Sequence, residues 1–110
     1  MRGDRAYLTY MRESIALVEL YTAEGEEAFS TDLRTQDAVL RRMETPADAA
    51  AHLSDELKAR YPQIRWRQIS DFRNVLAHGY TEIRLDQVWQ AIVHDLPTLK
   101  MVVDEELGRS

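Results

Sequence analysis

Apolar residues recur three and four positions apart along almost the whole chain, and this spacing constrains the fold more than any other feature. Successive residues of an α-helix turn by about 100°, so such residues lie on one face. Four stripes follow this rule: Leu8, Met11, Ile15 and Val18; Val39, Met43, Ala50, Leu53 and Leu57; Trp66, Ile69, Phe72 and Leu76; and Leu85, Val88, Trp89, Ile92, Leu96, Leu99 and Val103. Only four glycines and three prolines occur in 110 residues, which is too few for a turn-rich all-β fold. We therefore predict an all-α antiparallel bundle of four to five helices.

The first helix is predicted over residues 4–24, with Gly25 just past its end and a short connection over residues 26–30. Ser30 and Thr31 are the expected N-caps of the next helix, since a hydroxyl oxygen can accept a backbone N–H in the first turn.

The second stripe extends to about residue 60 and contains Pro46, which either kinks one helix or separates two. Gly79 is the expected stop of the third helix. Pro97 should bend the last helix, because proline lacks a backbone donor.

A second apolar line, formed by Tyr10, Leu17 and Tyr21, follows another face of the first helix. A helix that is apolar on two sides is buried on two sides. Two interpretations remain open: this helix lies at the centre of a monomer, or it also contacts a second subunit.

Composition excludes several classes of function. The chain has no cysteine, so disulfides, cysteine-ligated zinc and thiol nucleophiles are impossible. No two histidines are three or four residues apart, so we expect neither a metal site nor a cofactor. No run of about 18 apolar residues occurs, which excludes a membrane-spanning helix. Charged residues recur every few positions in the first stretch of the sequence, which therefore has no apolar signal-peptide core. We expect one domain over residues 1–110, no membrane partner and a cytoplasmic location.

The net charge of −5 is unevenly distributed. Residues 58–73 carry +4, and the remainder carries −9. Twelve of the 14 basic residues are arginine, whose planar guanidinium binds phosphate with two parallel hydrogen bonds. Tyr61 and Trp66 lie in the basic segment and could stack on bases, although Trp66 also fits the apolar stripe, and a core position is the favoured interpretation.

One polar cluster stands out, comprising Arg73, Asn74, His78 and Tyr80. On a helix Asn74 and His78 share a face, and Arg73 is about 140° away from His78. Arginine can hold a phosphate and histidine can transfer a proton without a metal. The alternative is a helix C-terminus at which His78 merely interacts with the terminal carbonyls. His52 and His94 are interpreted as helix surface residues.

Arg73-Asn74-x-x-Ala77-His78-x-Tyr80 resembles the R-x4-H-x-Y motif of the HEPN superfamily. More narrowly, the chain resembles the HepT-like ribonuclease toxins, which are encoded beside an MntA-type nucleotidyltransferase antitoxin. Three further blocks are similar to that family, in the same order: residues 35–42, residues 60–69, and residues 88–99 with Val88-Trp89 and Asp95-Leu96-Pro97-x-Leu99.

The resemblance implies a HEPN bundle that forms a homodimer, with a shared cleft lined by the motif helices. It implies a metal-independent endoribonuclease toxin, in which Arg73 and His78 are catalytic and Asn74 supports them. It also implies that the cognate nucleotidyltransferase silences the toxin by AMPylation of Tyr80. Arg65 and Arg67, in the basic segment, are the candidates for RNA binding.

The chain departs from the family pattern at Pro46, which should alter the local helix. A second hypothesis also remains open: a non-catalytic HEPN module that binds a nucleotidyltransferase or a nucleotide, with Arg73 and His78 gripping phosphates without breaking a bond.

Overall fold

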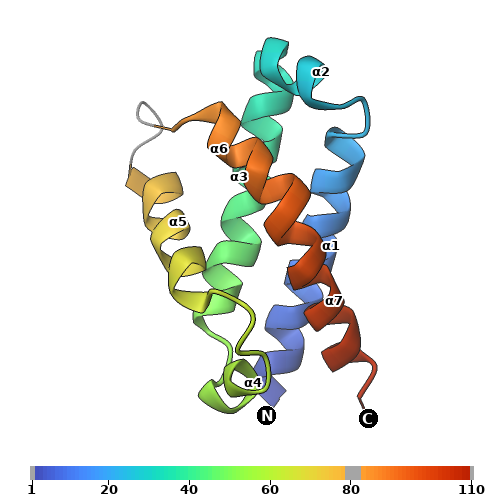
Figure 1. Cartoon of the computed structure of the whole chain (residues 1–110). Coiled ribbons are helices and arrows are strands. Elements are labelled where there is room, and N and C mark those ends of the chain that lie inside the picture. Colours follow the sequence, from blue (N-terminus) through green and yellow to red (C-terminus); the bar gives the residue numbers. More distant parts are fainter. Residues whose placement is uncertain (1, 79–82, 110) are drawn as a thin grey trace.

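The computed structural model describes residues 2–78 and 83–109, with the side chains of residues 2, 77 and 78 outside that description. Every regular element in this part of the chain is helical, which confirms the all-α prediction (Figure 1). The elements are α1 (Arg2–Tyr21), α2 (Glu26–Thr31), α3 (Leu33–Ala51), α4 (Asp55–Ala59), α5 (Trp66–His78), α6 (Leu85–Gln90), the π-helix η2 (Ala91–Asp95) and α7 (Leu96–Leu107).

Helix α3 runs through the middle of the bundle, with α1 and α5 packed on either side of it (Figure 1). The α6–η2–α7 segments follow one another without a break and cross in front of α3, where α7 packs against α1. Helices α3 and α5 run in opposite directions. The predicted stripes form the core: Met11, Val18 and Val39 are fully buried, for example.

The connection between α1 and α3 differs from the prediction. Helix α1 ends at Tyr21, and Gly25 has a φ of 97° as the N-cap of a short helix, α2. The prediction of a plain connection over residues 26–30 was wrong because Phe29 is buried and fixes this segment against the core.

Asp32, rather than Ser30 or Thr31, caps helix α3. Its carboxylate accepts the N–H of Arg34 at 3.1 Å and the hydroxyl of Thr35 at 2.7 Å. The hydrogen bond from the Thr35 side chain is the largest cause of a lowered pKa for Asp32.

The two alternatives at Pro46 resolve into one helix, because α3 continues through this residue and buries it. The helix ends at Ala51 instead of near residue 60. Ser54 caps α4, with its hydroxyl oxygen accepting the N–H of Leu57, and it donates its own hydroxyl to Asp4 at 2.6 Å. This contact attaches the turn between α3 and α4 to the start of α1.

Pro97 disturbs the last helix as expected, and the disturbance takes the form of a π-helical turn. The N–H of Leu96 bonds to the carbonyl of Ala91, five residues back, instead of four. The wider turn lets the chain accommodate a residue that lacks a backbone donor. No helix in the described part of the chain is both long and apolar enough to span a membrane.

Candidate functional site

Arg73 lies on α5 and faces α3. Its guanidinium Nε donates to Oδ1 of Asp48 at 2.8 Å, across 25 residues of sequence. The two side chains are 44% and 52% exposed, so the ion pair contributes little to stability. The ion pair instead orients the Arg73 side chain. Asp48 binds the guanidinium at Nε, which leaves the two terminal nitrogens, Nη1 and Nη2, to bind an anion.

An open cleft of about 420 Å³ lies beside this ion pair, between α1, α3 and α5. It is lined by Tyr7 and Tyr10 from α1, by Arg73 from α5, and by side chains of α3 between Arg41 and Ala49. Within it Arg41 binds Glu44 at 2.9 Å. The cleft therefore offers charged, polar and aromatic groups from three helices.

The remaining motif residues lie toward the end of α5, which stays helical through His78. Asn74 is exposed on α5, one helical turn before position 78. Arg73, the residue before Asn74, projects toward Asp48 on α3. The side chain of His78, together with Gly79 and Tyr80, lies outside the described residues, and their roles stay predictions.

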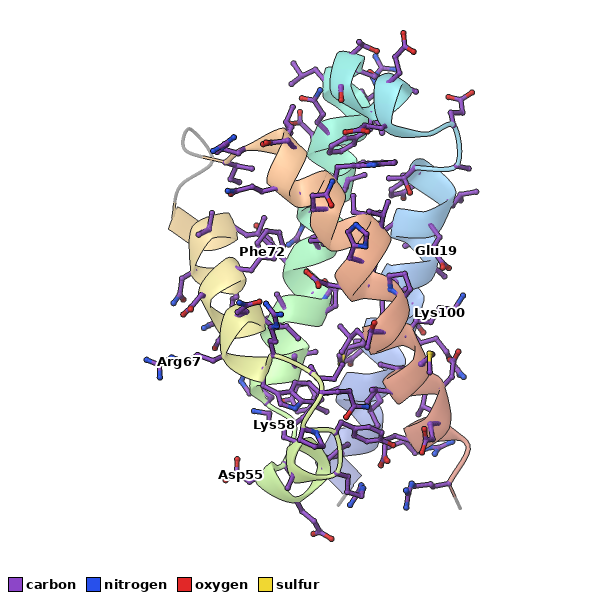
Figure 2. The ribbon with its side chains drawn as sticks, in the orientation of Figure 1. Glu19, Asp55, Lys58, Arg67, Phe72 and Lys100 are labelled. Carbon is purple, nitrogen blue, oxygen red and sulfur yellow. The ribbon has the colours of Figure 1, made fainter. Side chains whose placement is uncertain are left out.

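The two predicted RNA-binding arginines have different surroundings: Arg67 is on α5, and Arg65 immediately precedes this helix. Arg67 is exposed and points away from the bundle (Figure 2), on the face that also carries Asn74. Arg65 borders a second, mostly apolar cleft of about 440 Å³ between α5 and the α6–η2–α7 segments. That cleft is lined from α5 by Gln68, Ile69, Phe72 and Val75.

The expectation that Tyr61 could stack on bases was wrong. Tyr61 is only 5% exposed, and its hydroxyl donates to the buried carboxylate of Glu106. Trp66 packs against the core as predicted, with its indole N–H shared between the carbonyls of Lys58 and Tyr61. Both aromatic rings anchor the chain at the start of α5.

The other histidines have structural surroundings. The ring of His52 stacks on Tyr7 with centroids 5.0 Å apart, and its Nδ1 lies 2.9 Å from the Asp48 carbonyl. His94 is exposed on η2. Among the described residues, no group of three or more His, Asp or Glu side chains is placed to hold a metal ion.

Two features of the site were missed from the sequence: Asp48 as the partner of Arg73, and the aromatic wall from α1. Both are long-range contacts, for which spacing within one helix gives no signal. The only indication was that an acid is present at position 48 despite the departure at Pro46.

Comparison with known proteins decides the family. The model of the family described as "Ribonuclease HepT-like" matches residues 11–106 of the chain. The chain belongs to this family. The resemblance to HepT-like members of the HEPN superfamily is thereby confirmed, and the matched residues include all of α3 and α5, which carry the ion pair between Asp48 and Arg73.

Two relatives illustrate the range of this HepT-like family. A "Probable ribonuclease HepT" from Thermococcus cleftensis is 33% identical over 100 residues, covering 90% of this chain and 91% of its own length. A "Gamma-glutamylcyclotransferase and putative RNase" from Methanocaldococcus jannaschii is 35% identical over 115 residues. That match covers all of this chain but only 52% of the Methanocaldococcus protein, so the chain spans about half the length of that relative. No solved structure matches the chain.

Proposed function

We propose that this protein is a metal-independent endoribonuclease whose reaction centre is formed by Arg73 and His78. One observation carries the proposal: Arg73 is half-exposed at a cleft, is oriented by Asp48, and lies on the helix that ends at His78. Membership of a ribonuclease family supports the choice of RNA as the substrate.

The chemistry is transesterification at a ribose 2′-hydroxyl. Arg73 holds the scissile phosphate and stabilises the negative charge that accumulates on its oxygens. His78 acts as the base that accepts the 2′-hydroxyl proton, or as the acid that protonates the leaving 5′-oxygen. Asn74 supports the histidine, one turn away on the same face. DNA lacks the 2′-hydroxyl, so it is not cleaved.

The face of α5 that carries Arg67 and Asn74 is exposed, which supports a shared cleft in a homodimer. Arg67 points away from the bundle (Figure 2), and Asn74, about two turns further along α5, is exposed. A substrate bound there is enclosed only if a second surface covers it. A second α5 provides that surface, and the paired arginines would attract the RNA backbone. Arg65, which immediately precedes α5 and borders the other cleft, adds positive charge near the start of the helix.

We propose further that the protein is the toxin of a toxin–antitoxin pair, silenced when a partner nucleotidyltransferase attaches AMP to Tyr80. The modification adds negative charge and an adenosine group two residues after His78, which would repel and obstruct RNA. The support is the position of Tyr80 in the motif that resembles the toxin family.

The decisive experiment is an RNA cleavage assay with EDTA present. We expect cleavage by wild type and a loss of at least a hundredfold in Arg73→Ala and His78→Ala. Arg34→Ala and His94→Ala are matched controls, since both side chains are exposed and lie outside the cleft. These controls should retain wild-type rates.

Equal cleavage by all five proteins would mean that a contaminant or another site does the cutting. Absence of cleavage by wild type, with harmless expression of the gene alone, would favour a nucleotide-binding or nucleotidyltransferase-binding module instead. Growth arrest that His78→Ala relieves would support the toxin.

A further inference from the structure

We propose that the cleft between α1, α3 and α5 is a nucleobase subsite, in which Tyr10 stacks on a base adjoining the phosphate held by Arg73. This inference rests on the proposed function, because it places an RNA strand at Arg73. It adds an affinity determinant from α1, a helix that lies outside the motif.

Tyr10 has the exposure that a stacking platform requires. Its side chain is 55% exposed at the edge of the cleft, and it has no aromatic neighbour among the described residues. Tyr7, one turn earlier, differs because its ring already stacks on His52. Tyr7 therefore forms a fixed wall, whereas Tyr10 presents an open ring face to a ligand.

The remaining lining suits the edges of a base. Thr45 has a hydroxyl that donates and accepts, and Arg41 and Glu44 form an ion pair beside it. All four bases display both donors and acceptors, so a mixed lining accepts any of them. The subsite is therefore expected to hold RNA mainly through stacking, with little preference for sequence.

The cleft also has the correct size and position. A volume of about 420 Å³ is within the range of small-ligand sites. From Asp48 to Arg41 the cleft follows two turns of α3, about 10 Å. Because α5 runs in the opposite direction, this path runs alongside α5 from Arg73 in the direction of its C-terminal end. A nucleotide that adjoins the phosphate held by Arg73 therefore has room in the cleft.

The test compares Tyr10→Ala, Tyr10→Phe and Leu20→Ala with wild type. Leu20 is a matched control, because it is an exposed apolar residue on the same helix but outside the cleft. The readouts are KM and kcat for single-stranded RNA, and Kd for single-stranded DNA of the same sequence, which can stack but cannot be cut. We expect Tyr10→Ala to raise KM and Kd about tenfold for all four bases, with kcat changed less than twofold.

Tyr10→Phe keeps the ring and should stay within twofold of wild type, as should Leu20→Ala. Unchanged KM and Kd in Tyr10→Ala would overturn the subsite, even if wild type cleaves RNA. Equal losses in the Phe and Ala variants would overturn stacking in favour of the hydroxyl. A smaller oligomer of Tyr10→Ala in sedimentation would place Tyr10 in a subunit contact and also overturn the proposal. If wild type does not cleave RNA, the proposed function fails, whereas Kd for DNA still tests the subsite.

Discussion

Replacing Glu106 with glutamine should destabilise the bundle at the end opposite the connection between α5 and α6. The Glu106 side chain is 5% exposed and accepts hydrogen bonds from Arg60 Nη2 at 2.6 Å and from the Tyr61 hydroxyl. It also forms an ion pair with Arg109, whose Nε lies 3.0 Å from Oε2. The cluster ties the connection between α4 and α5 to α7. Glutamine keeps the volume but removes the charge and turns an N–H₂ group toward one of the donors.

The expected loss is about 2 kcal/mol in the free energy of unfolding. A hydrogen bond to a charged group contributes about 1.5–3 kcal/mol, and the Tyr61–Glu106 bond is the fully buried one. The ion pairs with Arg60 and Arg109 add little, because those side chains are 35% and 56% exposed. Tyr61→Phe should also cost about 2 kcal/mol. The double variant should lose less than the sum of the two, since both remove the same bond.

The assay is urea unfolding followed by helical circular dichroism, with Glu105→Gln as the exposed neighbouring control. A loss of 2 kcal/mol corresponds to a fall in Tm of about 8 °C for a chain of this size. A change below about 0.5 kcal/mol in Glu106→Gln, or full additivity in the double variant, would refute the reasoning. Cleavage of RNA well below the Tm should be unaffected, because Glu106 does not line the cleft beside Arg73.

The same cluster predicts how stability depends on pH. Burial raises the pKa of Glu106, but hydrogen bonds from Arg60 and Tyr61 outweigh it and hold the pKa below its ordinary 4.5. Its contribution is therefore present above about pH 4.5 and is lost as the pH falls through the folded-state pKa. Burial and the Glu106 carboxylate raise the pKa of Tyr61 from 10.0 to about 12, so that contribution is present below pH 10 and is lost as the pH rises toward 12. We expect the free energy of unfolding of Glu106→Gln, measured across this pH range, to lack the decrease at acid pH that Glu106 contributes. At alkaline pH the free energy of unfolding of this variant should decrease less than that of wild type.

Asp48→Asn should lower kcat for RNA about tenfold, because the Arg73 guanidinium is no longer held in one orientation, while KM changes less than twofold and the free energy of unfolding stays within about 0.5 kcal/mol of wild type. Asp48→Glu should partly restore kcat, and an unchanged kcat in Asp48→Asn would exclude a positioning role. Incubation with the cognate nucleotidyltransferase and ATP should add the mass of AMP to wild type but not to Tyr80→Phe, and modification of that variant would identify another target. Ser54→Ala should lower the free energy of unfolding by about 1–2 kcal/mol, since it removes both the α4 cap and the hydroxyl bond to Asp4. In an Asp4→Ala background the loss should be smaller, because only the cap remains to be removed, and an equal loss would contradict the coupling.

Much of the fold could be predicted because its signals are local. The stripe that contains Met11 and Val18 is buried, and Pro97 disturbs the last helix. The errors occur where burial outweighs local preference. Phe29 holds residues 26–31 in a helix that their own pattern does not require. Pro46 remains inside one helix, where its burial offsets the lost backbone bond.

The motif of the candidate site could be identified without a structure, because Arg73, Asn74 and His78 are close in sequence. The catalytic roles assigned to these residues stay predictions. The homodimer, the antitoxin partner and the AMPylation of Tyr80 stay predictions. Tyr61 could not be assigned from its basic neighbours, because its partner Glu106 is 45 residues away.

By itself, the sequence determined the helical class, the absence of thiol chemistry and the motif, because apolar spacing, composition and neighbouring residues are properties of short stretches. Only the tertiary structure decided what surrounds Arg73. It placed Asp48 on the Nε of Arg73 and Tyr10 in the same cleft. It also placed Arg65 at a second cleft, while Arg67 points away from the bundle. Such neighbours come from helices far apart in sequence, and their proximity depends on how the whole bundle packs around α3.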